Sequence, residues 1–216
     1  MKKRPFNLLL IAFVFLFLVA PIFGESKLQS PLVTFLFMTS IVYTLGAFLK
    51  SKPKFYLAFC LAGFSFVLTL LVQSDVLGKW FALAEILFYL IFVSMVVYLI
   101  VRFILAQRVI SSDTIKAGVC VYLLLGLLWS SVYMLLYLFD AQSFRYSGNI
   151  TPENPYFFIY YSFTVITTLG FGDVVPNNTF AINLSMLEAI CGQMYIAIFV
   201  ASIVSVYITQ NMSKKS

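Results

Sequence analysis

The sequence predicts an all-α membrane protein with six transmembrane helices and a short helix that enters the membrane and turns back before the last of them. Of the 216 residues, 62% are hydrophobic and only 10% are charged, against about 25% charged in soluble domains. Mean hydropathy is +1.00. The apolar residues fall in runs of about 20, which is the length that a helix needs to cross a bilayer. This composition excludes a soluble enzyme, a disordered chain and a fibrous protein.

The six predicted spans are separated by short segments that contain glycine or proline as helix breakers. They are Phe6–Phe23, Pro31–Leu49, Phe55–Val72, Trp80–Val101, Ile115–Leu138 and Thr179–Asn211. The first span follows basic residues and is therefore also compatible with a signal peptide. Its apolar run exceeds the usual core of about 7–15 residues and no A-x-A cleavage site follows, so a retained helix is favoured.

Basic residues lie between the spans and predict the orientation of the chain. With the N-terminus in the cytoplasm, eleven Lys and Arg lie inside and three lie outside. The inside group is Lys2, Lys3, Arg4, Lys50, Lys52, Lys54, Arg102, Arg108, Lys116, Lys214 and Lys215, and the outside group is Lys27, Lys79 and Arg145. Both termini are expected in the cytoplasm. The net charge of +6 is therefore explained by membrane orientation, and we expect no nucleic-acid partner.

Catalytic and metal-binding residue types are scarce. The chain contains no His, which removes the commonest general base and metal ligand. The cysteines Cys60, Cys120 and Cys191 each lie inside an apolar run and indicate free buried thiols. We expect no catalysis and no cofactor.

The segment between the fifth and sixth spans carries the most specific pattern. Asn154 as N-cap and Pro155 at the first helical position predict a short helix over Pro155–Thr167, too short to span. The chain must therefore return through Thr-Leu-Gly-Phe-Gly at 168–172. Non-helical backbone at membrane depth is tolerated where it is buried in protein or lines a water-filled path. Glycine permits positive φ, so successive carbonyls can face one side and replace the hydration shell of a monovalent cation.

The run Thr-Leu-Gly-Phe-Gly-Asp at 168–173 resembles the potassium-channel signature Thr-Val-Gly-Tyr-Gly-Asp. The resemblance implies a selectivity filter after a pore helix, four copies of the chain around one pore, and K+ as the permeant ion with no other metal. It implies that the ion path is lined by the backbone oxygens of Thr168, Leu169, Gly170, Phe171 and Gly172.

The same resemblance assigns residues that support the filter, namely Tyr160, Tyr161, Thr164, Thr167 and Asp173. Phe171 replaces the family's tyrosine and removes a hydroxyl that bonds to the surrounding aromatic residues, here expected to be Tyr160 and Tyr161. Thr164 stands where some bacterial relatives have a glutamate that pairs with the acid at position 173. Asp140 and Glu153 are expected near the outer mouth, either to enrich cations or as ordinary solvated charges.

The last span carries the expected gate and cavity. Gly192 matches the family's hinge glycine; close helix packing is the alternative, and the hinge is favoured. Gln193, Ile196 and Val200 match cavity-lining positions. Glu188 is an intramembrane carboxylate, and such a group is a functional-site hypothesis by default. It is expected to bond the pore helix at Thr164 or to titrate, and the structural bond is favoured.

The first four spans resemble a voltage sensor in number but lack its charges. Trp80–Val101 contains no basic residue, so strong voltage gating is not expected. Two units are predicted: a four-helix peripheral membrane domain over 1–110, and a pore domain over 111–216. Few residues follow Met212, so no cytoplasmic ligand-binding domain is expected.

The sequence therefore predicts a homotetrameric, potassium-selective channel of a bacterial-type plasma (inner) membrane, which passes ions passively. Two alternatives stay open. One is a non-selective or sodium-permeable cation channel, and the other is a non-conducting membrane scaffold or accessory subunit.

Overall fold

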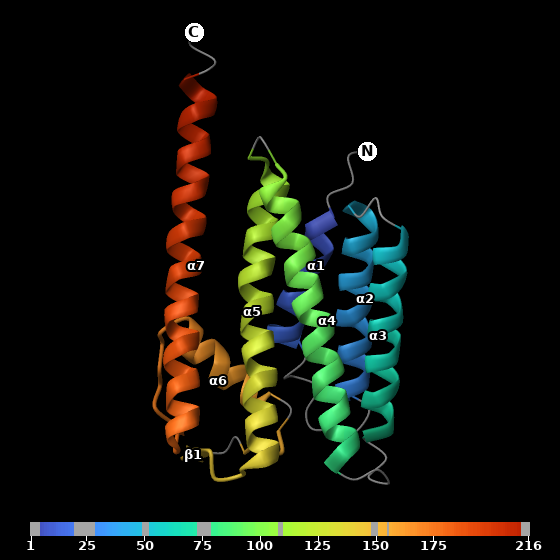
Figure 1. Ribbon diagram of the computed structural model, residues 1–216, viewed down its shortest axis with the longest axis vertical. Helices are drawn as coiled ribbons and strands as arrows, with labels where there is room; N and C mark the ends of the chain where they lie inside the picture. The colour runs from blue at the N-terminus through green and yellow to red at the C-terminus, as the bar shows by residue number, and fades with distance from the viewer. Residues whose placement is uncertain are drawn as a thin grey trace.

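The computed structural model describes residues 5–19, 29–48, 52–72, 79–107, 110–147, 151–154 and 156–212. Long helices stand side by side, and one short helix lies between the last two long ones (Figure 1). The elements in chain order are α1 (Pro5–Val14), the π-helical turn η1 (Phe15–Val19), α2 (Gln29–Phe48), α3 (Lys52–Val72), α4 (Lys79–Leu105), α5 (Ser112–Phe139), β1 (Phe144–Tyr146), α6 (Phe157–Ile166), β2 (Val174–Pro176) and α7 (Thr179–Met212).

In the described residues each predicted span coincides with helical structure, and four of these helices are long and apolar enough to cross a membrane; residues 20–23 and 49 of the first two spans lie outside the described part. Their apolar lengths are Lys52–Leu71, Lys79–Leu105, Ser112–Phe139 and Thr179–Ser205. Within the described part of the chain, the first two predicted spans supply shorter apolar helices, Phe6–Leu18 and Thr34–Ala47. The protein is thus an all-α, multi-pass membrane protein, and the number of six spans stays a prediction.

Successive long helices run in opposite directions, so α1 begins and α7 ends on the same side of the bundle (Figure 1). That side also holds the starts of α3 and α5 and the end of α4, whereas β1 and the start of α4 lie on the opposite side. The first side carries Lys52, Lys54, Arg102 and Lys116, and the opposite side carries Lys79 and Arg145. The other basic residues behind the orientation prediction lie outside the described residues: Lys2, Lys3, Arg4, Lys27, Lys50, Arg108, Lys214 and Lys215.

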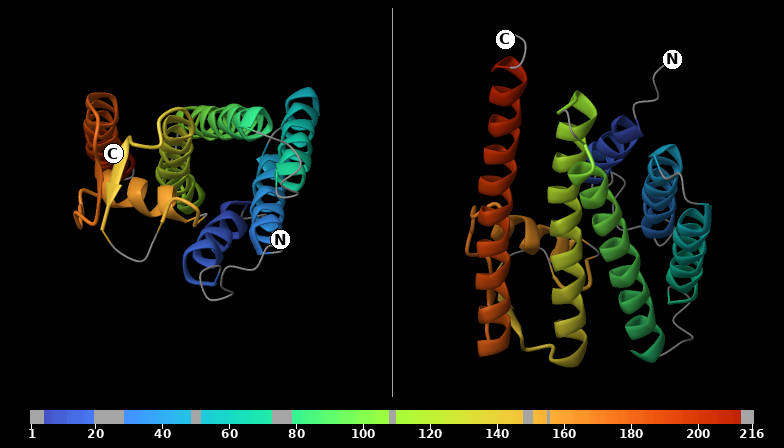
Figure 2. Two further views of the ribbon diagram at one scale, coloured as in Figure 1. Left: turned by 90° about the horizontal axis from the view of Figure 1, so that it is seen from below. Right: turned by 45° about the horizontal axis from the view of Figure 1, so that its top comes forward.

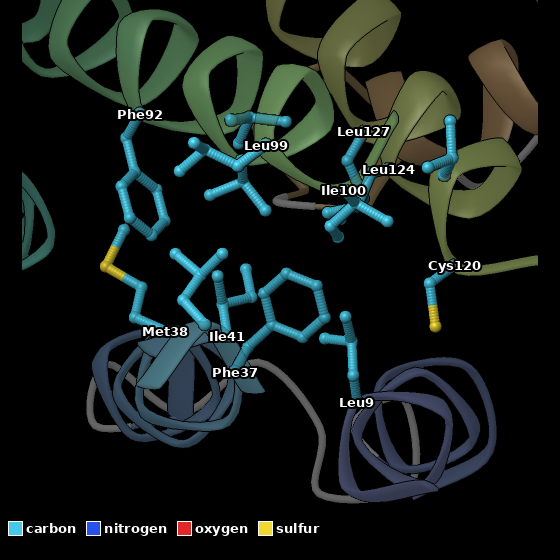
Figure 3. Close-up of a cluster of buried hydrophobic side chains, with 14 of the residues drawn as sticks. Leu9, Phe37, Met38, Ile41, Phe92, Leu99, Ile100, Cys120, Leu124 and Leu127 are labelled. Carbon is cyan, nitrogen blue, oxygen red and sulfur yellow. The ribbon is translucent and has the colours of Figure 1, made fainter. Parts of the chain in front are cut away.

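The helices α1 to α5 enclose one apolar core, and α6 and α7 lie to one side of it (Figure 2). Side chains from α1, α2, α4 and α5 point toward one another across the core (Figure 3). They include Leu9, Phe37, Met38, Ile41, Phe92, Leu99, Ile100 and Leu124. The core crosses position 110, so the peripheral helices and α5 are packed into one body, and the division into two domains stays a prediction.

The first helix is an integral part of this core. Phe6, Leu9 and Phe13 of α1 are fully buried, and the Lys116 ammonium of α5 donates to Asn7 Oδ1 at 2.6 Å. Without α1, apolar faces of α2 and α5 would lose their cover. This packing favours a retained helix over a cleaved signal peptide.

The outer surfaces of the helices also carry many large apolar side chains. Of the three cysteines expected to be buried, Cys120 is buried, but Cys60 and Cys191 are exposed. The prediction was wrong for these two because a helix that faces lipid is apolar on every side, so an apolar run does not distinguish core from surface. In α7 only 11% of the most apolar stretch is buried, against 44% in α5. The single chain therefore leaves α7 largely uncovered.

Candidate functional site

The short helix α6 begins two residues later than the sequence predicts. Its N-cap is Tyr156, which makes no side-chain capping bond, and the helix runs over Phe157–Ile166. Asn154, the expected N-cap, forms the preceding turn: its Oδ1 accepts from the backbone N–H of Tyr156 at 2.9 Å. Its carbonyl accepts from the N–H of Phe157 at 3.0 Å. Pro155 lies outside the described residues.

The chain folds back onto the end of α6 as it leaves the helix. The N–H of Thr168 donates to the carbonyl of Val165 at 2.9 Å, and the N–H of Gly170 donates to the carbonyl of Thr164 at 3.1 Å. These carbonyls belong to the last turn of the helix, where carbonyls lack the regular partner four residues on; the Val165 carbonyl also accepts from the N–H of the C-cap residue Thr167. The return segment, defined as residues 168–172, is thus fixed to the helix that precedes it.

The return segment has an alternating backbone conformation. The angle φ is 59° at Thr168, 54° at Gly170 and 81° at Gly172, and no other described residue has a positive φ. Leu169 and Phe171 therefore have negative φ, and the sign alternates over all five residues. In a regular strand successive carbonyls point to opposite sides, whereas this alternation turns them toward one side. Thr168 is the one non-glycine in a left-handed conformation, which costs about 1–2 kcal/mol.

The outer end of the return segment is held by two of the expected supporting residues. The Tyr160 hydroxyl donates to Asp173 Oδ2 at 2.6 Å, and the Tyr160 ring stacks on Phe171 with centroids 6.1 Å apart and planes 4° apart. Tyr161 has a different role, because its hydroxyl and Ser185 Oγ of α7 lie 2.6 Å apart. Tyr160 therefore holds the return segment, and Tyr161 joins α6 to α7.

The two supporting threonines bond within their own helix. Thr164 Oγ1 donates to the carbonyl of Tyr161 at 2.8 Å, and Thr167 Oγ1 donates to the carbonyl of Phe163 at 2.5 Å. The bond expected between Thr164 and Glu188 is therefore wrong. Positions 162 and 164 lie on nearly opposite faces of a helix, at about 100° per residue, and position 162 is the one that faces α7.

Glu188 lies at the meeting point of three helices. It is fully buried. The Tyr133 hydroxyl of α5 donates to Oε2 at 2.5 Å, and Ser162 Oγ of α6 lies 2.5 Å from Oε1. The same Ser162 Oγ lies 2.7 Å from the carbonyl of Gly126 in α5. One carboxyl on α7 thus joins α5 and α6.

Gly192 lies where α7 passes the end of α6. A Cβ at this position would lie 2.7 Å from both the carbonyl oxygen and Cγ1 of Ile166. The same Ile166 carbonyl accepts from the Tyr122 hydroxyl of α5 at 3.0 Å. The helix α7 runs through Gly192 without interruption. The close contact with Ile166 thus supports the alternative that Gly192 serves helix packing. The hinge role stays a prediction.

Two further glycines of α5, Gly118 and Gly126, pack against aromatic rings of other helices. The sequence did not indicate this role. A Cβ at Gly118 would lie 1.8 Å from the ring of Phe199 of α7, and one at Gly126 would lie 2.6 Å from the ring of Phe163 of α6. Their spacing of two helical turns on one face of α5 is the only sequence signal that could have indicated them. Tyr133 and Ser162 were also missed.

The residues expected to line the ion path and the cavity face away from the single chain. Leu169 is 59% and Phe171 is 64% exposed. Gln193, Ile196 and Val200 are exposed along α7. These side chains are exposed in one copy of the protein, Phe171 included although its ring stacks on Tyr160, so one copy does not enclose them.

Beyond the return segment the chain is tied to the loop that follows α5. The strand β1 pairs antiparallel with β2, with Tyr146 opposite Val174. At the same rim the N–H of Gln142 and the side-chain amide of Asn178 donate to Asp140 and hold the pKa of this carboxyl below its usual range. This end of the bundle is thus a hydrogen-bonded rim with an ionised acid.

The part of the chain that contains α6 and the return segment matches one known family. Residues 121–209, from α5 to near the end of α7, match the model of a family described as an ion channel. The match supports an ion channel. It covers α6, the return segment and the residues around Glu188 and Gly192, and it indicates transport across a membrane rather than catalysis. No curated protein and no solved structure matches the chain.

Proposed function

We propose that the protein is a potassium-selective channel in which residues 168–172 form the selectivity filter and α6 is the pore helix. The observation that carries the proposal is the alternating sign of φ over Thr168–Gly172. It supports a row of carbonyl dipoles that face one side, and such a row can replace the hydration shell of K+. K+ is the transported ion, and no other metal or cofactor is proposed.

The proposed assembly is a homotetramer around the filter. One chain supplies one row of carbonyls and cannot surround an ion. The uncovered face of α7 and the exposed Leu169 and Phe171 support contact with further copies, because large apolar side chains beside a polar path need protein cover. In this assembly Gln193, Ile196 and Val200 line the cavity below the filter.

The proposed orientation places the start of α1 and the end of α7 in the cytoplasm of a cell with a bacterial-type plasma membrane. The distribution of Lys and Arg supports this orientation. The filter then opens on the outer side, next to the rim that carries Asp140. Six membrane crossings, with α1 and α2 as the first two, fit this topology.

Two other functions remain to be separated from this one by experiment. A sodium-permeable pore needs the same architecture with a wider or more flexible filter. A non-conducting scaffold needs only the helix bundle. The first experiment reconstitutes the purified protein in liposomes and compares K+ with Na+ flux. We expect K+ flux well above Na+ flux; equal fluxes indicate a non-selective pore, and no flux of either ion indicates a scaffold.

A further inference from the structure

Glu188 is a fully buried carboxyl in the apolar region between α5, α6 and α7. Within the described residues, the two helices nearest to it supply no cation, because α6 and α7 contain no Lys or Arg. The one basic residue of α5, Lys116, lies about 25 Å from Tyr133 along the helix. The titratable groups that interact with Glu188 are the hydroxyls of Tyr122, Tyr133 and Tyr161. An ionised carboxylate here would be an uncompensated buried charge.

The hydroxyl of Ser162 has too few hydrogens to serve an ionised Glu188. Its hydroxyl has one hydrogen but lies within bonding distance of two oxygens, the Gly126 carbonyl at 2.7 Å and Glu188 Oε1 at 2.5 Å. If Glu188 were ionised, both oxygens would be acceptors, and one of the two contacts would have no hydrogen.

A proton on Oε1 satisfies every contact of the cluster. Glu188 then donates to Ser162 Oγ, and Ser162 donates to the Gly126 carbonyl. Tyr133 donates to Oε2, the remaining carbonyl-type oxygen of the acid. Three hydrogens serve three contacts, and no charge is left in the apolar layer between α5, α6 and α7.

The geometry points to Glu188 as a positioning residue of the proposed filter, a neutral carboxylic acid that donates to Ser162 and thereby fixes the pore helix between α5 and α7. This inference rests on the proposed function. One turn after Glu188, Gly192 lies against Ile166 at the end of the same pore helix. The filter is bonded to that helix through the carbonyls of Thr164 and Val165. A shift of α6 at Ser162 therefore moves the filter.

Glu188→Gln and Glu188→Leu distinguish a neutral acid from other roles. Glutamine can donate to Ser162 through its amide and accept from Tyr133 through its carbonyl, as the protonated acid does. Leucine fills similar space without hydrogen bonds. We expect K+ flux within about twofold of the parent protein for Glu188→Gln, and about tenfold or more lower for Glu188→Leu. Asp113→Asn is the control and leaves flux unchanged, because Asp113 lies in the first turn of α5, about 30 Å along the helix from Tyr133.

Infrared spectroscopy of the tetramer at neutral pH tests the proton itself. The spectrum of the parent protein minus that of Glu188→Gln contains a carboxylic-acid carbonyl band if the inference is correct. The difference between the parent and a variant of an exposed loop acid, Glu153→Gln, contains none. The inference is overturned if the parent-minus-Glu188→Gln spectrum lacks this band. It is also overturned if the K+ flux of Glu188→Gln is as low as that of Glu188→Leu.

Failure of the proposed function gives a different pattern. If the parent protein conducts no K+, the potassium-channel proposal falls. The infrared band and the melting temperatures of the purified variants still decide whether Glu188 is a neutral donor. We expect Glu188→Gln to melt close to the parent protein and Glu188→Leu to melt at a lower temperature. Equal melting temperatures for the two variants contradict the inference.

Discussion

At the residue scale, backbone conformation sets which side chains the filter segment accepts. Gly170 and Gly172 occupy the left-handed region at no steric cost, whereas Thr168 occupies it with a side chain. The hydrogen bonds from Thr168 and Gly170 to the end of α6 hold this conformation. The alternation of φ therefore depends on both glycines and on the pore helix.

Replacing either glycine by alanine is expected to abolish selective K+ flux. A Cβ at Gly170 or Gly172 meets no atom within 4 Å, so the cost comes from the positive φ, at about 1–2 kcal/mol per copy. Gly63→Ala is the matched control, because this helical glycine of α3 also has open space around it. Flux is measured in liposomes, and assembly by size-exclusion chromatography. Normal selective flux in Gly170→Ala and Gly172→Ala would contradict the filter assignment.

Gly192→Ala is expected to impair the channel because it overpacks α7 against Ile166. Overpacking costs about 1–3 kcal/mol. A double variant, Gly192→Ala with Cys191→Gly, distinguishes the hinge from the packing role. It restores a flexible glycine to the same turn of α7 at an exposed position, but it does not restore the close contact between position 192 and Ile166. We expect the double variant to remain as impaired as Gly192→Ala in single-channel recordings. Recovery of open probability in the double variant would show that bending matters more than packing.

The irregular backbone of residues 168–172 could be predicted from the sequence, whereas the partners of Glu188 could not. The proposed filter is a local pattern of glycines and threonine at fixed spacing. The partners of a buried carboxyl depend on how three helices are rotated toward one another, and apolar helices in a membrane carry little periodicity to indicate it. The expectation therefore placed the bond on the correct helix but at Thr164 instead of Ser162.

At the scale of elements, the pore helix is held by three neighbours. Glu188 and Gly192 of α7 contact it on one side, and Gly126 of α5 receives its Phe163 ring. The third neighbour is η1, where Phe17 meets Phe163 in an edge-to-face contact with centroids 4.8 Å apart. The segment that follows the N-terminal helix therefore reaches α6, which precedes the proposed filter.

Phe17→Ala is expected to lower K+ flux or open probability by loosening the pore helix. An aromatic pair contributes about 0.5–1.5 kcal/mol, and four copies would lose it together. Phe35→Ala removes a comparable ring contact, with Phe66 at 5.2 Å, between α2 and α3. This control is expected to leave conduction unchanged. Equal effects of the two substitutions would mean that η1 has no specific role at the pore.

The helices were predicted from the sequence more accurately than their packing. Every predicted span coincides with a helix, because runs of apolar residues bounded by breakers determine length. Which face is inward could not be predicted, as Cys60 and Cys191 illustrate. The two glycines of α5 that pack against aromatic rings could not be predicted for the same reason.

At the scale of the whole molecule, the bundle of α1 to α4 lacks the charges of a voltage sensor. In α4 the only charged residues after Lys79 are Glu85 and Arg102. Arg102 lies in the last turn and interacts with Tyr98, donating from Nη1 to its hydroxyl at 3.3 Å. Its guanidinium also lies 5.8 Å from the Tyr98 ring centroid. No row of basic residues crosses the membrane on this helix.

Open probability is therefore expected to change little between about −100 and +100 mV, since each charge moved across the membrane contributes only about 2.3 kcal/mol per 100 mV. Single-channel recording in planar bilayers measures this dependence. Arg102→Gln is the informative variant, because Arg102 is the one basic residue near the end of α4, and it is expected to leave the voltage dependence unchanged. A steep, saturating curve would mean that charges elsewhere in the bundle move with voltage.

The central claim, that residues 168–172 select K+, is tested most directly by the reversal potential in a planar bilayer with K+ on one side and Na+ on the other. Purified parent protein is compared with Gly172→Ala under the same conditions. The account predicts a reversal potential strongly displaced in the direction set by the K+ gradient, and loss of this selective current in Gly172→Ala. A reversal potential near zero in the parent protein, with sustained current, would contradict it.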